Sequence, residues 1–174
     1  MIRTPRMVGL LAVVTATLAL VACSSTVSGT PLPAPTVSPT HATAEDGLRS
    51  LEACAVLNQL LAGQGFDPGE RKTVRNECVA TKLEYGALGI ALDPQQSLGD
   101  LTGQLPESSH FDINGRNAVI GQPSGEGSCE VGLEVGQRAR AVVIASISRE
   151  DLRDQVCPAA QELATKLEPL LPGS

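Results

Sequence analysis

The chain has 174 residues with 19 acidic and 13 basic side chains, a formal net charge of −6, and its length predicts one folded domain. This acidity excludes nucleic acid as a natural partner, because phosphates require a basic surface. Two Phe, one Tyr and no Trp exclude aromatic stacking platforms and predict a core of aliphatic side chains.

Residues 1–22 are typical of an export signal. Arg3 and Arg6 precede an apolar run over 7–22, and this segment holds no acidic residue. The run has 16 residues, whereas a membrane-spanning helix needs roughly 20. Removal of the segment would leave 11 basic and 19 acidic residues in the mature chain.

The end of this run, Leu20-Val21-Ala22-Cys23, resembles the bacterial lipobox. In that motif the cysteine sulfur takes a diacylglyceryl thioether, and cleavage before the cysteine frees an amine for N-acylation. A second acyl chain turns weak, reversible membrane binding into stable anchoring. We therefore expect Cys23 to anchor the protein to the extracytoplasmic face of the cell membrane. The alternative is an ordinary export signal with a coincidental cysteine.

Residues 23–46 predict a flexible tether behind the acylated cysteine. Thirteen of the 20 residues over 24–43 are Ser, Thr or Pro. The segment therefore has too few apolar groups to offset the conformational entropy that ordering would cost. The prolines favour extended backbone, and the composition also suits O-glycosylation. We interpret His41 as a solvated linker residue. Ordered structure should begin near Ala44, with a folded domain over residues 47–174.

The folded domain opens with a predicted helix over residues 50–63. Ser50 is a plausible N-cap and Gly63 can end the helix. Two alternating runs, 78–85 and 88–93, follow around a bend at Gly86 and predict a β-hairpin. A short helical turn is expected over 97–101.

Two further turns connect later strands. Asn114-Gly115 tolerates positive φ at both positions, as a type I′ hairpin requires. The connection over 136–138 joins a strand ending at Val135 to one beginning at Ala139. It should pair Glu134 with Arg140 on the exposed face of the sheet and Val131 with Val143 on the buried face.

The chain ends in a helical region. Ser148 with Asp151 suggests a capping box, and Pro158 predicts a break with the main helix running from Pro158 to about Leu167. The element order of helix, antiparallel strands and helix predicts an α+β fold. We expect a sheet of about five to six antiparallel strands with the N- and C-terminal helices packed on one face.

Four cysteines remain after Cys23, and an exported chain meets oxidising conditions, so they predict two disulfides. Three pairings are open. We expect Cys54 with Cys78 and Cys129 with Cys157, because each pair joins a helix to a nearby strand. Each disulfide would stabilise the domain by about 3.5 kcal/mol through the loop that it closes. The absence of a CxxC pair argues against a zinc site, and we expect no metal or other cofactor.

Each of the four cysteines lies in a short motif, and the motifs follow one another in this order: Cys54-Ala55-Val56-Leu57, Cys78, Cys129-Glu130-Val131 and Cys157-Pro158-Ala159-Ala160. With the lipobox and the tether, they resemble a family of actinobacterial surface lipoproteins of unknown function, over about residues 47–172. Members often carry a Trp shortly after the second cysteine, where this chain has Val79 and Ala80. The layout is more distantly similar to extracellular sensor domains of mycobacterial receptor kinases. Neither resemblance implies catalytic residues.

Residues that could carry chemistry are few. A Ser-His-Asp triad would have to use His110, which we interpret as an exposed residue at a strand end, and no GxSxG motif occurs. Asp151 and Asp154 are interpreted as a solvated helix face. Val142 and Ile144 fall on the face of the sheet opposite Val143. They form either an exposed apolar patch for a partner or a surface covered by another segment, such as 103–110.

These observations favour a non-enzymatic, lipid-anchored module that binds a small ligand or a protein of the cell envelope. A structural or assembly factor of the envelope is the alternative. A hydrolase that uses His110 and a serine is the weakest hypothesis.

Overall fold

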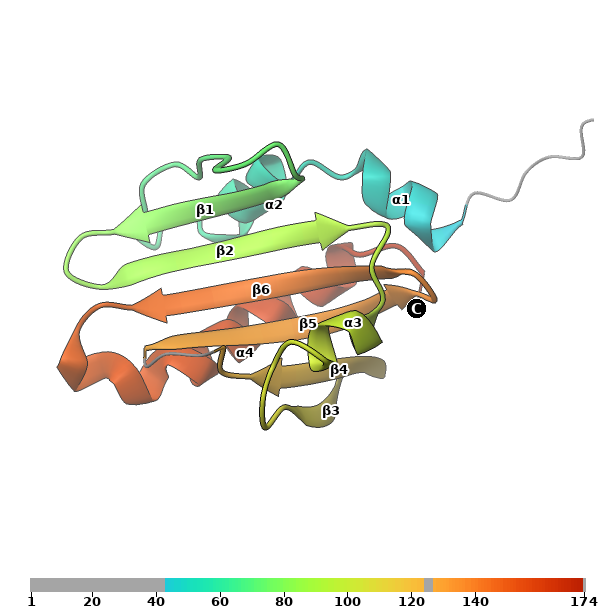
Figure 1. The fold of residues 1–174 in the computed structure, drawn as a ribbon. Helices are drawn as coiled ribbons and strands as arrows, with labels where there is room; N and C mark the ends of the chain where they lie inside the picture. Colours follow the sequence, from blue (N-terminus) through green and yellow to red (C-terminus); the bar gives the residue numbers. More distant parts are fainter. Residues whose placement is uncertain (1–42, 124–126, 174) are drawn as a thin grey trace, which may run out of the picture. The chain divides into compact units, whose positions relative to one another are not determined.

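The computed structural model describes residues 43–123 and 127–173. The expected export signal, Cys23 and residues 24–42 of the tether lie outside the described residues. The described part is an α+β domain with a six-stranded antiparallel sheet and helices at both ends of its sequence, which confirms the predicted fold class (Figure 1).

The sheet has the strand order β1-β2-β6-β5-β4-β3, and every neighbouring pair is antiparallel. The strands are β1 (Glu77–Lys82), β2 (Gly86–Asp93), β3 (Ser109–Ile113), β4 (Arg116–Gly121), β5 (Ser128–Gly136) and β6 (Ala139–Ile147). The hairpin of β5 and β6 occupies the centre, although it comes last in the chain. Val131 pairs with Val143 and Glu134 with Arg140, which confirms the predicted register. The prediction that this second pair lies on an exposed face is wrong for Arg140, which is buried and bonds Ser97 and Gln96.

The predicted turns are also present. β1 and β2 form a hairpin in which Lys82 pairs with Gly86. Between β3 and β4, Asn114 has φ 53° and Gly115 has φ 87°. Positive φ at both positions is the requirement of a type I′ turn, so this turn joins the strands as the Asn-Gly pair predicts.

Three helices, α1 (Ala44–Ser50), α2 (Ala53–Leu60) and α4 (Val156–Leu167), pack on one face of the sheet and bury an aliphatic core. Two 3₁₀ segments, η1 (Glu150–Gln155) and η2 (Glu168–Leu170), flank α4. The largest fully buried side chains are aliphatic or cysteine, as the composition predicts. They include Leu48, Leu57, Ile90, Leu133 and Leu167.

Two local predictions about helix ends, the caps at Ser50 and Ser148, are wrong, whereas the main C-terminal helix begins within two residues of Pro158 as predicted. Ser50 is the last residue of α1 and does not cap α2, whose N-cap is Glu52. A capping box at Thr43, which bonds Asp46, creates the extra helix α1 ahead of the expected one. Ser148 caps no helix, since Asp151 pairs with Arg149 instead. Pro158 lies in the first turn of α4, where a proline costs no intrahelical hydrogen bond.

Two disulfides connect the helices to the sheet. Cys54 of α2 is bonded to Cys78 of β1, and Cys129 of β5 is bonded to Cys157 of α4, with Cα–Cα distances of 5.0 and 5.1 Å. Both pairings are those predicted from the sequence. Each bond joins a helix to a different strand, so α2 and α4 are covalently held on the same face.

The opposite face of the sheet carries one short helix, α3 (Leu98–Thr102), with Ser97 as its N-cap. Leu98, Leu101 and Leu105 pack on Val119 and Val142 there. Gly132 permits this approach, because a Cβ on it would lie 2.8 Å from Leu98 Cδ1. Val142 is therefore buried, so of the two alternatives for Val142 and Ile144 the cover by another segment holds and the exposed patch does not. Ile144 lies at the margin of this cluster and is partly buried.

A buried ion pair ties the end of the chain to the β3–β4 hairpin. Arg116 Nε donates to Glu168 Oε1 at 3.0 Å, and the two side chains are 4% and 7% exposed. Asn114 Nδ2 donates to Glu168 Oε2 at 3.0 Å. Hydrogen bonds from Asn114 and from Arg116 hold the pKa of Glu168 below its ordinary value, although burial acts in the opposite direction.

We expect Glu168→Gln to lower the free energy of unfolding by about 3 kcal/mol, because it leaves the buried Arg116 without a counter-charge. A lowered folded-state pKa contributes stability above the unfolded pKa, and this contribution disappears as the pH falls through the folded pKa. As the pH is lowered from 5, the free energy of unfolding of the variant, measured by urea unfolding, should therefore fall less than that of the wild type. The exposed Glu150→Gln is the matched control, with a change below about 0.5 kcal/mol. Equal effects of the two substitutions would contradict the prediction.

Candidate ligand-binding site

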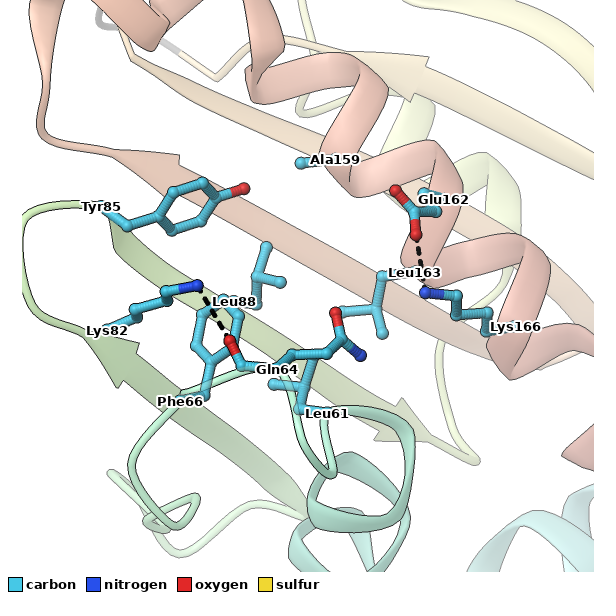
Figure 2. A pocket seen from close by; sticks show the side chains of 10 residues that line it. All are labelled: Leu61, Gln64, Phe66, Lys82, Tyr85, Leu88, Ala159, Glu162, Leu163 and Lys166. Carbon is cyan, nitrogen blue, oxygen red and sulfur yellow. Dashed lines mark hydrogen bonds and ion pairs between the residues drawn. The ribbon is translucent and has the colours of Figure 1, made fainter.

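A pocket of about 220 Å³ lies on the helix-covered face, at the end of the sheet where β1 turns into β2 (Figure 2). Three segments that are distant in the sequence form it: the end of α2 with the loop behind it, the β1–β2 hairpin, and α4. Its lining residues are Leu61, Gln64, Phe66, Lys82, Tyr85, Leu88, Ala159, Glu162, Leu163 and Lys166.

The base of the pocket is apolar. Leu61, Leu88 and Leu163 belong to the main hydrophobic core and are each less than about a tenth exposed, and Ala159 of α4 packs against them. Each comes from a different element, so the base depends on the packing of α2, β2 and α4. Such a surface suits the apolar part of a ligand.

Two of the three aromatic side chains of the protein meet at this pocket. Phe66 and Tyr85 pack edge to face, with ring centroids 5.7 Å apart and an interplanar angle of 86°. Both rings are partly buried. In Figure 2 the Tyr85 hydroxyl points across the pocket toward α4. The phenol thus offers a polar group above the apolar base of the pocket.

Lys82 places a positive charge at the same wall. Its Nζ lies 5.5 Å from the centroid of Phe66 and 5.8 Å from that of Tyr85, within the range of cation–π attraction. The same Nζ donates to the Gln64 carbonyl at 2.8 Å. This bond engages one of the three donors of the ammonium group, so an incoming anion could accept another.

α4 contributes a pair of opposite charges to the rim. Lys166 Nζ donates to Glu162 Oε1 at 2.6 Å, one helical turn away. Burial raises the pKa of Tyr85, and the negative charge of Glu162 raises it further. The phenol therefore stays protonated across the neutral range and acts as a hydrogen-bond donor.

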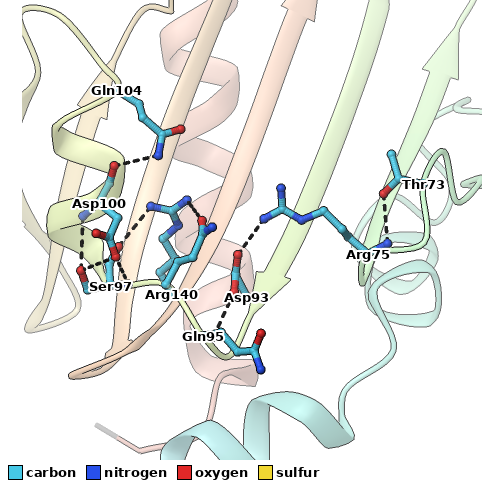
Figure 3. Close-up of polar contacts among 9 residues, drawn as sticks. Thr73, Arg75, Asp93, Gln95, Ser97, Asp100, Gln104 and Arg140 are labelled. Atoms are coloured by element: carbon cyan, nitrogen blue, oxygen red, sulfur yellow. Dashed lines mark hydrogen bonds and ion pairs between the residues drawn. The ribbon is translucent and has the colours of Figure 1, made fainter.

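A second polar cluster lies beside α3 (Figure 3). Arg140 Nη1 donates to the Ser97 carbonyl at 3.1 Å, Arg140 Nη2 bonds Gln96, and burial lowers the pKa of Arg140. Close by, Arg75 pairs with Asp93 at 2.7 Å. Arg140 thus bonds the residues at the start of α3 and Arg75 bonds Asp93, so we interpret the cluster as the support of α3. The adjacent cavity of about 400 Å³ includes the paired Arg75 and Asp93 in its lining.

The residues singled out in the sequence do not gather at one site. His110 lies exposed on β3, where its cross-strand neighbour is Val119 and not a residue of a catalytic triad. Sequence reasoning missed the pocket. A usable signal existed in Phe66, Lys82 and Tyr85, which place two of the rare aromatic residues on either side of a lysine.

Two further findings concern the part of the chain that the structure describes. Within residues 43–123 and 127–173, no three His, Cys, Asp or Glu side chains are grouped so that they could hold a metal ion. None of the helices over the same residues has the length and hydropathy needed to span a bilayer.

Comparisons of the chain with protein-family models, with curated proteins and with solved structures find no match. Its function is therefore inferred from its own residues.

We expect the ionisation midpoint of Tyr85 to lie above the ordinary 10.0 in the folded protein and to return to that value in denaturant. Ultraviolet absorbance measures this directly, because the chain has one Tyr and no Trp. Glu162→Gln should lower the midpoint only in part, since burial is the larger cause. Glu134→Gln, at the opposite end of the sheet, is the control and should leave it unchanged. A folded-state midpoint at or below 10.0 would refute this description of the pocket.

Proposed function

We propose that the protein is a lipid-anchored, non-enzymatic domain of the cell envelope whose pocket binds a small ligand with an apolar body and one anionic group. The observation that carries the proposal is the position of Lys82, whose ammonium lies over the Phe66 and Tyr85 rings above an aliphatic base. Apolar surface with a few convergent polar groups is the usual composition of a ligand site.

The charge arrangement selects the sign of the ligand. The Lys82 ammonium, above the aliphatic base of the pocket, can form a charge-assisted hydrogen bond with a carboxylate, and the Tyr85 hydroxyl is a second donor. Glu162 neutralises Lys166, so Lys82 is the cation that remains for the ligand at this wall. The volume of about 220 Å³ is below the range of sites for drug-sized molecules, which indicates a small ligand or one that inserts a single apolar branch.

The envelope location rests on the sequence at the N-terminus. The lipobox-like Leu20-Val21-Ala22-Cys23 and the Ser/Thr/Pro-rich residues behind it support an acylated cysteine and a tether. The two disulfides are consistent with an oxidising compartment. The resemblance to actinobacterial surface lipoproteins points in the same direction.

We expect octanoate to bind the full-length chain and to change the fluorescence of Tyr85, the only strong fluorophore of a chain without Trp. Octanol should bind more weakly, because it lacks the anionic group. Lys82→Ala should weaken octanoate binding by about tenfold and octanol binding much less.

Lys72→Ala is the matched control for this titration, since Lys72 pairs with Glu70 away from the pocket. Thermal unfolding checks that both variants remain folded. If octanoate and octanol bind alike, or if the two lysine variants behave alike, an anion-selective pocket is excluded.

We expect mass spectrometry of the native protein to find Cys23 as the acylated first residue, carrying diacylglyceryl and N-acyl groups. Cys23→Ala should abolish both the modification and the recovery of the protein with membranes, while the disulfide-bonded domain stays folded. A native protein with an uncleaved, unmodified N-terminus would disprove the anchor and leave the pocket untouched.

A further inference from the structure

The two edges of the sheet differ in how they are covered. The outer edge of β1 pairs with a segment of the same chain: Glu70 and Val79 exchange backbone hydrogen bonds of 2.9 and 3.0 Å, and Asp67 N donates to Thr81 O at 2.8 Å. β3 forms the other edge, and within the described residues its only strand partner is β4 (Figure 1). An uncovered edge is a template for pairing with another strand.

The backbone groups that β3 presents at this edge belong to His110 and Asp112. In a two-residue hairpin the residues that flank the loop, here Ile113 and Arg116, form a hydrogen-bonded pair. Further from the loop, non-hydrogen-bonded and hydrogen-bonded pairs alternate along the two strands. The backbone N–H and C=O groups of Phe111 are therefore hydrogen-bonded to those of Ala118 on β4. The N–H and C=O groups of His110 and Asp112 point away from β4, toward the free edge.

We propose that β3 pairs in antiparallel orientation with β3 of a second copy of this chain, with the two-fold axis at Phe111. In this register His110 of each copy faces Asp112 of the other. These are the residues with outward backbone groups, so the two facing pairs can form four backbone hydrogen bonds. Each pair also brings an imidazole beside a carboxylate, which is a favourable cross-strand combination.

The side chains select this register over its neighbours. Moving one strand by two residues keeps outward groups opposite each other but places His110 against His110 or Asp112 against Asp112. The central register alone makes both contacts complementary, as the self-complementary interface of a two-fold dimer requires.

The two faces of the sheet also match across the axis. Phe111 lies on the helix-covered face and is partly buried, so the pairing would bring two aromatic rings together there. His110 and Asp112 are both exposed on the other face. The contact is short, because β3 has five residues, so the dimer is reversible and smaller than a standard interface.

The first test is a cysteine crosslink in the full-length chain. At the axis, two Phe111→Cys residues would form a non-hydrogen-bonded pair with Cα atoms about 4.5 Å apart, within disulfide range. Mild oxidation should give a reducible covalent dimer. The wild-type chain, which contains Cys23, sets the background.

Ser109→Cys is the matched control on the same strand and the same face. In the proposed register the two substituted positions are offset by four residues, or about 13 Å, too far for a disulfide. Equal crosslinking of the two variants, or none with Phe111→Cys in a folded protein, overturns the proposal.

An exchange of charges tests the same contact without depending on Phe111. His110→Asp should weaken self-association by about tenfold, as should His110→Lys combined with Asp112→Lys, because each places like charges opposite each other. A mixture of the two variants restores opposite charges and should associate at least as well as the wild type in sedimentation experiments. A mixture that associates no better than its components contradicts the pairing.

Discussion

The two disulfides are the constraint on which the helix-covered face of this domain depends. One joins α2 to β1 and the other joins α4 to β5, and β2 and β6 lie between those strands. Because the helices are held on different strands, the space between them at one end is floored by Leu88 of β2 and becomes the pocket. With few aromatic side chains to fill the core, covalent links supply stability that packing alone would have to provide.

The features that could be predicted from the sequence depend on residues close together in the chain. Asn114-Gly115 specifies its own turn geometry, and the short connection before Ala139 determines that Glu134 faces Arg140. The disulfide pairing could be predicted because each pair joins a helix to a strand at a short sequence separation, 24 residues in one case and 28 in the other. Hydrophobic alternation then sets which face of each strand is buried.

The features that could not be predicted depend on tertiary contacts. Nothing local to Val142 shows that α3 covers it; the cover requires Gly132, on a neighbouring strand, to accept the side chain of Leu98. The pocket likewise assembles Phe66, Tyr85 and Glu162 from three separate segments. The start of the first helical region was also mispredicted, because the capping box of Thr43 and Asp46 begins an additional helix, α1, that ends at Ser50.

The position of the β5–β6 hairpin has a consequence for biogenesis. The β1–β2 and β3–β4 hairpins are made first, yet each gains its second neighbour only when the last third of the chain supplies the middle of the sheet. A nascent chain that lacks β5 and β6 therefore holds two ribbons that cannot join into one sheet, and two-stranded ribbons are marginally stable in water. The complete sheet therefore forms only after the C-terminal portion, which carries β5 and β6, has been synthesised.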